Sequence, residues 1–284
     1  MKKRITAMFF SGTGTTRKIV RGIAKELTEL AELIELTELT DLDGMISFNE
    51  MDFTLPEARK QAVTYTKDDL VILGVPVIAG RVPNVLLKYL NTVRGQGALG
   101  IPVVVYGNRN YDDALIELKD IMEDNGFVVI SAGAFVGEHS FSKELAQGRP
   151  DDRDMAVVSE FAHRIYEKIN TELSFVDLQI DGIKPYRPYY VAKDKEGNPF
   201  DFRKITPKTS SSCTDCKLCT ELCPMGSIDT EDVSRLTGPC IKCCACVKMC
   251  PVEAKYFDDA GYLNHKQELE EAYTLRREPD LFVE

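Results

Sequence analysis

The chain has 284 residues, which is enough for about two domains, and 44% of them are hydrophobic, as in ordinary soluble proteins. Its net charge of −10 argues against nucleic acid as a partner, because binding to phosphates needs a basic face. No run approaches the roughly 18 apolar residues of a membrane span. The first residues lack an export-signal pattern, so we expect a cytoplasmic protein.

Strand-like and helix-like segments alternate over residues 1–172. Strands are predicted at residues 4–10, 33–36, 70–75, 101–106 and 127–132. Helices are predicted at residues 16–30, 84–92, 113–123 and 155–169, the last capped by Asp151 or Asp152. Residues 44–68 fit poorly and are interpreted as a helix-and-loop crossover. The alternation predicts an α/β domain with a doubly wound parallel sheet of five strands in the order 2-1-3-4-5.

Residues 11–16, Ser-Gly-Thr-Gly-Thr-Thr, join the first strand to the first helix. Their amides and hydroxyls suit a phosphate at the helix N-terminus, where the helix dipole favours negative charge. The loop has no lysine and lacks the third glycine of the dinucleotide fingerprint, so it is typical of neither a P-loop nor a Rossmann site. We interpret it as a site for one phosphomonoester, such as that of FMN; a turn without a ligand is the alternative. The residues predicted to bind are Ser11, Thr13, Gly14, Thr15 and Thr16.

Two later loops follow strands and are expected on the same carboxyl edge of the sheet, where such folds bind ligands. Their predicted FMN-binding residues are Pro76, Val77, Ile78, Ala79 and Gly80 in one loop, and Gly107, Asn108, Arg109, Tyr111 and Asp112 in the other. We expect Tyr111 to stack on the flavin ring; a packed surface aromatic is the alternative. His139, in a third such loop at residues 133–140, either reaches the flavin or a substrate or is an ordinary loop histidine. His163 and His265 are predicted on helix surfaces.

Residues 176–204 are rich in proline and tyrosine and show little periodicity, so they are interpreted as a linker. Residues 181–208 are locally basic in an acidic chain. They form either a solvated linker or a basic strip that docks on the cysteine-rich segment that follows.

Eight of the nine cysteines form two copies of the pattern Cys-x-x-Cys-x-x-Cys-x-x-x-Cys-Pro. The first copy comprises Cys213, Cys216, Cys219 and Cys223, and the second comprises Cys240, Cys243, Cys246 and Cys250. This is the ligand run of bacterial iron–sulfur proteins, in which the fourth cysteine of each run binds the other cluster. On that pattern one [4Fe-4S] cluster takes Cys213, Cys216, Cys219 and Cys250, and the other takes Cys240, Cys243, Cys246 and Cys223.

Zinc sites and disulfide scaffolds are the alternatives for these cysteines. Zinc sites usually place two Cys-x-x-Cys pairs a dozen or more residues apart, and a disulfide scaffold favours an even number of cysteines and an oxidising compartment. Neither fits three cysteines within seven positions in a chain with nine. Cys244 belongs to neither run and is predicted to be a small buried residue beside a cluster.

The chain resembles the flavodoxin–ferredoxin fusion proteins of anaerobic microbes, through residues 11–16 and 106–111 on one side and both cysteine runs on the other. The resemblance implies a flavodoxin-like FMN domain at 1–175, a small α+β domain with two [4Fe-4S] clusters at 205–258, and a role in electron transfer. Arg109 departs from ordinary flavodoxins, and a cation there would stabilise the reduced flavin anion. Residues 259–284 are expected to be a tail, with a helix near 266–273, that packs on the first domain.

Two function classes follow. In the first, the protein is an electron carrier that links one-electron and two-electron redox proteins through its clusters and FMN. In the second, it is an FMN-dependent reductase of a small acceptor, such as a quinone or a nitro compound, fed by the clusters. The sequence shows no acid–base pair, which favours the carrier. A third reading, in which the first domain binds no flavin and serves as a docking module, is the least favoured.

Overall fold

The computed structural model describes residues 3–35, 48–171, 177–193, 197–199 and 201–284. The main sheet contains β1 (Arg4–Phe9), β2 (Asn49–Asp52), β3 (Asp69–Pro76), β4 (Leu99–Tyr106), β5 (Val128–Val129), β6 (Ala132–Val136) and β9 (Asp280–Phe282). The strands lie in the order β2-β1-β3-β4-β6-β9, with β5 also paired to β4. The pairs are parallel except for β6 with β9, so β9 adds an antiparallel edge to a parallel sheet.

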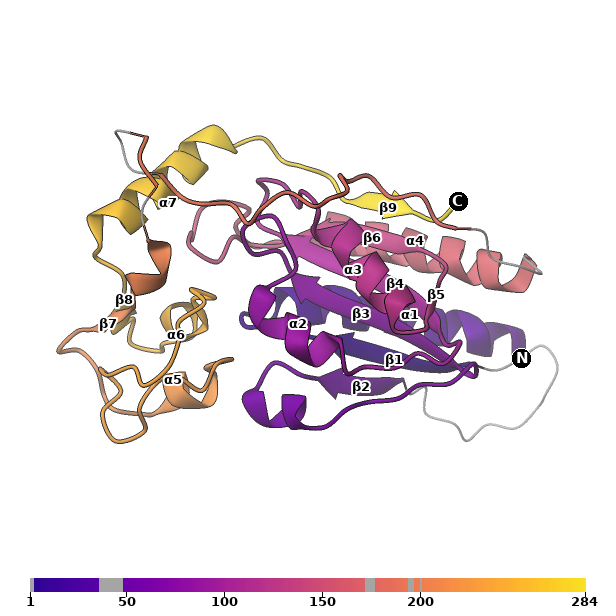
Figure 1. Cartoon of the computed structure of the whole chain (residues 1–284), viewed down its shortest axis with the longest axis horizontal. Helices are drawn as coiled ribbons and strands as arrows, with labels where there is room; N and C mark the ends of the chain where they lie inside the picture. The colour runs from indigo at the N-terminus through magenta and orange to yellow at the C-terminus, as the bar shows by residue number, and fades with distance from the viewer. Residues whose placement is uncertain (1–2, 36–47, 172–176, 194–196, 200) are drawn as a thin grey trace.

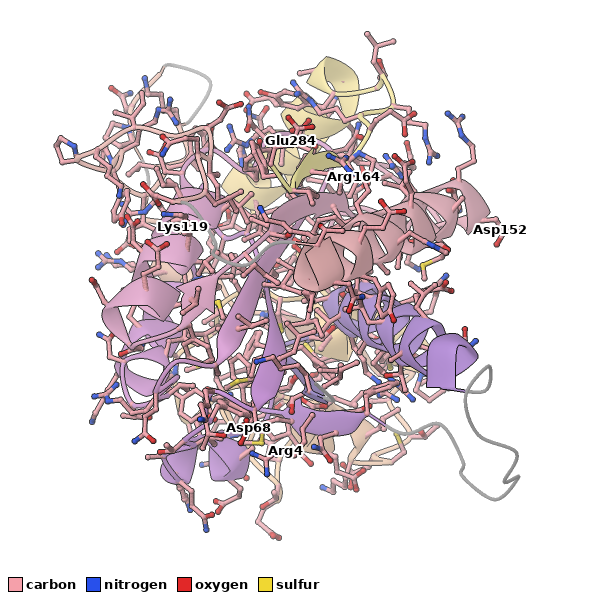
Figure 2. The ribbon with its side chains drawn as sticks, turned by 90° about the vertical axis from the view of Figure 1, so that its right-hand side faces the viewer. Arg4, Asp68, Lys119, Asp152, Arg164 and Glu284 are labelled. Carbon is pink, nitrogen blue, oxygen red and sulfur yellow. The ribbon has the colours of Figure 1, made fainter. Side chains whose placement is uncertain are left out.

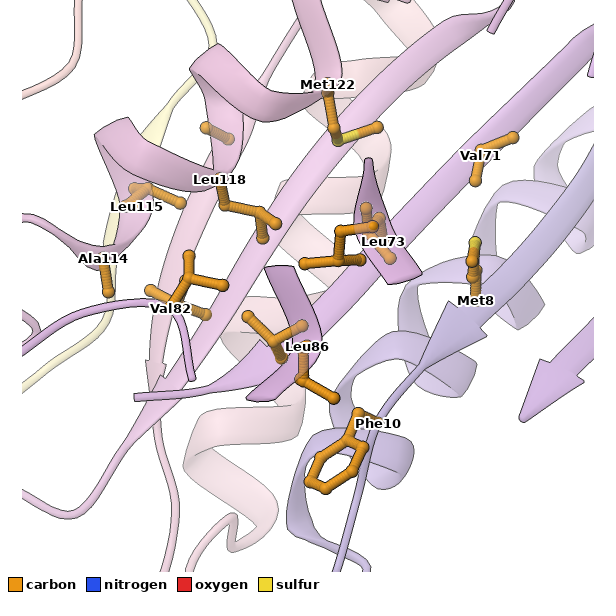
Figure 3. Close-up of a cluster of buried hydrophobic side chains, with 14 of the residues drawn as sticks. Met8, Phe10, Val71, Leu73, Val82, Leu86, Ala114, Leu115, Leu118 and Met122 are labelled. Carbon is orange, nitrogen blue, oxygen red and sulfur yellow. The ribbon is translucent and has the colours of Figure 1, made fainter. Parts of the chain in front are cut away.

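Helices cover both faces of this sheet (Figure 1). They are α1 (Thr15–Glu35) and α4 (Asp152–Thr171) on one face, and α2 (Asn84–Leu90) and α3 (Ala114–Asp124) on the other. Alternate residues of β1 supply the two cores, because successive strand side chains point to opposite faces. Phe9 packs with the α1 and α4 side, whereas Met8 lies in the cluster that Leu86 and Leu118 cover (Figure 3). The domain therefore has the doubly wound flavodoxin-like fold.

Most predicted elements of this domain are confirmed, but the second strand is not. The predicted strand at 33–36 is wrong, because residues 33–35 continue α1; residue 36 lies outside the described residues. The second strand is instead β2, in the segment interpreted as a crossover. The predicted fifth strand is divided into β5 and β6, so residues 133–136 belong to a strand and not to the following loop.

The predicted cap of the last helix of this domain is confirmed for Asp151. Its carboxylate accepts the backbone N–H groups of Arg153 and Asp154, each at 3.1 Å. These are two of the N–H groups that a helix start leaves without a partner inside the helix.

The end of the chain returns to the first domain. After α7 (Ala260–Ala272) the chain crosses the carboxyl edge of the sheet and forms β9 beside β6 (Figure 1). Arg276 of this segment pairs with Asp151 ahead of α4 at 2.6 Å. At the very end, Arg164 of α4 lies 3.9 Å from a carboxylate oxygen of Glu284 (Figure 2).

The cysteine-rich segment forms a small α+β lobe of ferredoxin-like character. It contains β7 (Lys208–Thr209), α5 (Leu218–Glu221), α6 (Ala245–Lys248) and β8 (Lys255–Tyr256), and β7 pairs antiparallel with β8. The lobe lies beyond the carboxyl ends of the parallel strands (Figure 1). Among the helices of the described residues, none is long and apolar enough to cross a membrane.

Residues 177–193 run along the first domain. Lys184 bonds to Asp120 of α3 at 2.8 Å, and Arg187 bonds to the buried Asp113 at 2.7 Å. The hydroxyl of Tyr189 donates to the carbonyl of Val82 at 2.8 Å. The suggestion that this basic strip docks on the cysteine-rich lobe is therefore wrong for Lys184 and Arg187, which contact acids of the first domain.

Candidate functional site

The cysteines gather around two cavities in the small lobe. The first cavity is lined by Cys213, Cys216, Cys219, Cys246 and Cys250. The second cavity is lined by Cys223, Cys240, Cys243, Cys244 and Cys246. Each cavity contains three cysteines of one run and the distal cysteine of the other, as the predicted ligand exchange requires, and the ligand assignment itself stays a prediction.

The two runs repeat one backbone conformation. The second residue after the first cysteine of each run, Asp215 or Lys242, has a positive φ angle of 55° or 54°. The fourth residue, Lys217 or Cys244, is again left-handed, with φ angles of 62° and 59°, and precedes the short helix of its run. Two left-handed residues turn each loop back on itself, and three cysteines of the loop line one cavity.

The same repeat explains the ninth cysteine. Cys244 occupies the position that Lys217 has in the first run, and its side chain is 3% exposed. Its Sγ lies 3.5 Å from the hydroxyl of Tyr262 and 3.4 Å from the carbonyl of Lys242. Cys244 is therefore buried, as predicted, and it lies at the second cavity with its thiol in contact with Tyr262 and Lys242.

Backbone amides bond to the distal cysteines. Ser227 N–H donates to Cys223 Sγ at 3.4 Å, and Ala254 N–H donates to Cys250 Sγ at 3.2 Å. At Cys250, burial acts to raise the pKa, but the surrounding amides outweigh it and the pKa is lowered. Such N–H···S bonds favour the thiolate, which is the form that binds metals.

The donor set fits a polynuclear cluster better than a single ion. Within the described residues, no three cysteine, histidine or acidic side chains converge on one metal ion. Burial raises the pKa of Cys243 to about 12, so a bound cation is needed to keep such a buried thiol ionised. Four thiols around one cavity match the four iron corners of a cubane cluster, each of which takes one thiolate.

The loop at residues 11–16 lies at the carboxyl end of β1. Lys18 N–H makes the first helical bond, to the carbonyl of Gly14 at 3.0 Å, so the amides before it have no acceptor within the helix. Arg17 N–H is the exception, because Ser11 Oγ accepts it at 3.1 Å. Gly14 has a φ angle of +88°, and a side chain added there would meet no atom within 4 Å. The turn therefore presents free donors to open space, as a phosphate site requires.

Two hydroxyls predicted in this loop have other roles. Ser11 Oγ is occupied by Arg17, as described above. Thr16 is 1% exposed and packs against Gly74, where an added Cβ would lie 3.0 Å from its methyl group. Thr13 and Thr15 are partly exposed and remain available as phosphate donors.

The loop at residues 76–80 lies beside the linker. Pro76 to Ala79 are partly exposed, and Ala79 and Gly80 have positive φ angles of 53° and 77°. Tyr190 N–H donates to the carbonyl of Ala79 at 2.9 Å, so the linker fixes this turn. An added Cβ on Gly80 would lie 2.5 Å from a carboxylate oxygen of Asp112, which places the two predicted flavin loops in contact.

The polar side chains of the 107–112 loop face protein partners. The Asn108 amide donates to the carbonyls of Tyr273 and Leu275 at 2.7 and 2.9 Å, so it anchors the C-terminal tail. Arg109 pairs with Asp112 and lies 5.6 Å from the centre of the Tyr190 ring. The expectation that Arg109 offers a free cation to a reduced flavin is therefore not supported, because Asp112 offsets its charge.

Tyr111 is placed in the core. It is 8% exposed, and its ring centre lies 5.5 Å from that of Tyr106. Burial first, and Asp280 of β9 next, raise the pKa of its hydroxyl. A ring packed in this way does not fit the predicted stacking on a flavin, so the packed alternative describes Tyr111 better.

His139 lies where the two domains meet. Its ring leaves no room for a side chain on Gly107, where an added Cβ would be 2.3 Å from Cδ2. Its carbonyl accepts Lys248 Nζ at 2.7 Å, and burial lowers the pKa of its ring to about 4.

His265 was predicted on a surface but is 7% exposed, beside Tyr190 and Phe202. That prediction was wrong because partners far away in the chain cover α7.

Contacts between the domains were not predicted from sequence. Gly12 packs on the second cavity, since an added Cβ would lie 3.2 Å from Cys243 Cβ and 3.6 Å from the Pro224 ring. Lys248 of α6 pairs with Glu138, and Arg59 donates to the carbonyl of Pro224 at 2.6 Å. Arg59 and Pro224 are 165 positions apart in the sequence, so no local sequence pattern predicts the bond between them.

Comparisons with known proteins agree with the cysteine pattern. Residues 206–265 match the family model of the 4Fe-4S dicluster domain. No curated protein sequence matches the chain. A domain of flavodoxin-like fold and a 4Fe-4S dicluster match in one chain support an electron-transfer role.

Among solved structures, similar chains include flavodoxins. A short-chain flavodoxin associated with a PDU bacterial microcompartment has 12% identity and a TM-score of 0.37, over 57% of this chain and 95% of its own. A flavodoxin of Streptococcus pneumonia TIGR4 has 17% identity and a TM-score of 0.35, over 56% and 94%. Rubredoxin oxygen:oxidoreductase from Desulfovibrio gigas has 14% identity and a TM-score of 0.40, over 61% and 38%.

Proposed function

We propose that this protein is an electron carrier that binds FMN on its first domain and two [4Fe-4S] clusters in its cysteine-rich lobe. The observation that carries the proposal is the direct contact between the loop of Gly12 and the wall of the second cavity at Cys243. Clusters exchange single electrons, whereas a flavin takes one or two, so the pair connects one-electron to two-electron redox partners.

The proposed FMN site uses backbone more than side chains. The amides of residues 12–16, together with the Thr13 and Thr15 hydroxyls, would bind the phosphate. The partly exposed backbone of Pro76 to Ala79 and of Gly107 would bind the polar edge of the ring. Asn108, Tyr111 and Arg109 would support this site by holding its loop in place.

The placement of the two cavities implies an order of transfer. The second cavity adjoins the first domain through Cys243. Cys216, which lines the first cavity, is the cysteine that is exposed to solvent. We therefore assign the second cluster to exchange with the flavin and the first cluster to exchange with external redox proteins.

The carrier is favoured over the reductase by the side chains near the predicted ring. Arg109 is paired with Asp112. His139 is partly buried and has a low pKa, and Lys248 of the small lobe donates to its carbonyl. These are the residues that would otherwise bind or protonate an acceptor beside the flavin.

Anaerobic purification with iron, sulfide and FMN counts tests the proposal. We expect about eight irons and one FMN per chain, because each of two cubane clusters has four irons. Rapid mixing with a reductant should then show cluster bleaching followed by flavin reduction. A protein without flavin or iron, or one whose flavin is reduced at the same rate after the clusters are removed, would refute it.

A further inference from the structure

Arg59 connects the two domains through uncharged acceptors. It lies in the short 3-10 helix η1 (Pro56–Lys60), just after β2. One guanidinium nitrogen donates to the carbonyls of Phe53 and Thr54 at 2.8 and 2.5 Å. Another donates to the carbonyl of Pro224 in the small lobe at 2.6 Å.

The positive charge of Arg59 has no acidic partner within the described residues. None of the ion pairs there includes it, and its three acceptors are neutral carbonyls. The guanidinium also lies 5.6 Å from the centre of the Phe10 ring. Arg59 is partly buried. An arginine stays charged in proteins, and taking an unpaired charge even partly out of water is unfavourable, so an opposite charge nearby would stabilise it.

The proposed second cluster and the proposed flavin phosphate are both anionic, and the segments that would hold them are bonded to Arg59 or to its acceptors. Pro224 directly follows Cys223, and both line the second cavity. On the other side, Thr54 Oγ1 accepts the N–H of Ser11, the first residue of the proposed phosphate loop, at 2.8 Å. The guanidinium therefore lies between the wall of the second cavity and the loop that would hold the flavin phosphate.

We propose that Arg59 is the counter-cation of the second cluster, supplied by the first domain, and that it raises the reduction potential of that cluster. This inference rests on the proposed function. A cluster with four thiolates is an anion, and a nearby positive charge makes the addition of a further electron more favourable. Arg59 would then make the second cluster a better electron acceptor than it would be without this charge, which favours transfer of electrons onto it from the first cluster.

A second cation lies near the same cavity but belongs to the small lobe. Lys242 is buried, and its Nζ donates to the carbonyls of Cys240 and Arg203 at 2.9 and 3.1 Å. Removing Arg59 should therefore lower the reduction potential of the second cluster, while Lys242 still supplies a positive charge nearby. Arg59 differs from Lys242 in that its contribution depends on the two domains being in contact.

The test compares R59Q, R59K and the control K60Q. Glutamine keeps N–H donors for the carbonyls but removes the charge, and lysine keeps the charge. Lys60 is an exposed neighbour that pairs with Glu57 at 2.5 Å and makes no contact with the small lobe among the described interactions. Each protein is purified without oxygen, its iron and FMN are counted, and both cluster potentials are measured by redox titration followed by electron paramagnetic resonance.

We expect R59Q to lower one of the two potentials by about 59 mV, which is a tenfold change in a one-electron equilibrium. R59K should recover most of this shift, and K60Q should leave both potentials unchanged. The shifted signal should be the one that disappears when Cys240 is replaced by alanine.

Two outcomes would overturn the role of Arg59. One is an R59Q protein with full iron and FMN whose two potentials equal those of the wild type. The other is loss of iron from both R59Q and R59K, which would make Arg59 a structural residue. A wild-type protein without clusters or flavin would instead refute the proposed function, so the two failures are distinguishable.

Discussion

Gly12 and Cys243 touch across the boundary between the two domains, because an added Cβ on Gly12 would lie 3.2 Å from the Cβ of Cys243. Gly12 belongs to the loop that we assign to the flavin phosphate, and Cys243 lines the second cavity. The backbone of Gly12 therefore packs directly against Cys243 in the wall of the second cavity, with no side chain between them. The absence of a side chain at Gly12 brings the proposed centres close together.

Replacing Gly12 with valine should separate the two domains. The branched side chain would overlap Cys243, and overpacking of this kind typically costs about 1–3 kcal/mol. We expect a lower thermal midpoint and slower electron transfer between flavin and clusters, measured by rapid mixing without oxygen. Gly12→Ala is the matched control with a smaller effect. Unchanged transfer in the valine variant would show that this contact does not set the distance between the centres.

The exchange of distal cysteines is tested by iron counts. Cys223→Ala should lose about four of eight irons and leave the same spectrum as Cys240→Ala, although Cys223 belongs to the other run. Cys250→Ala should likewise resemble Cys213→Ala. Cys244→Ala, which removes the one thiol that belongs to neither run, is the control and should keep about eight irons. If Cys223→Ala resembles Cys213→Ala instead, each run binds its own cluster.

The parts of the fold that could be predicted from sequence are those with a local signal. The fully buried strand β4 is a continuous apolar run, and the cysteine runs have a fixed spacing. The edge strand β2, Asn-Glu-Met-Asp, has polar and mostly exposed side chains, so it gives no apolar alternation. The apolar pair Leu33 and Ile34 imitated a strand, although residues 33–35 continue α1.

The candidate site, like the fold, could be predicted only where the sequence carries a local signal. Glycine positions at strand ends follow from local turn chemistry, but Asn108 and Tyr111 took other roles because the C-terminal tail arrives from more than 160 residues away. A local sequence pattern does not predict which distant segment of the chain will form hydrogen bonds with a given side chain. Arg59 was missed for the same reason, since its acceptor in the small lobe is 165 residues away.

Gly14→Asp should weaken FMN binding. A carboxylate there would face the proposed phosphate, and like charges repel. Gly14 also has a φ angle of +88°, which any side chain strains, so Gly14→Ala is the matched control. We expect the aspartate variant to bind FMN at least about tenfold more weakly than the alanine variant, or about 1.4 kcal/mol. Fluorescence titration of the apoprotein with FMN measures this, and equal affinities would remove the phosphate site from this turn.

His139 should make the protein less stable in mild acid. Burial lowers its pKa in the folded state to about 4, below the value of about 6.5 in an unfolded chain. Between these values the unfolded chain binds more protons, so stability is retained above about pH 6.5 and is lost as the pH falls toward 4. From about pH 7.5 to about pH 5.5 this amounts to about 1 kcal/mol.

Thermal unfolding without oxygen at these two pH values measures the effect. His139→Gln should reduce the loss of stability between them, because the neutral amide does not titrate. His163→Gln is the control, since His163 is exposed on α4, and it should lose as much stability as the wild type. If His139→Gln and the wild type respond equally to pH, His139 is not the group responsible, and its packing on Gly107 and below Lys248 does not keep it uncharged.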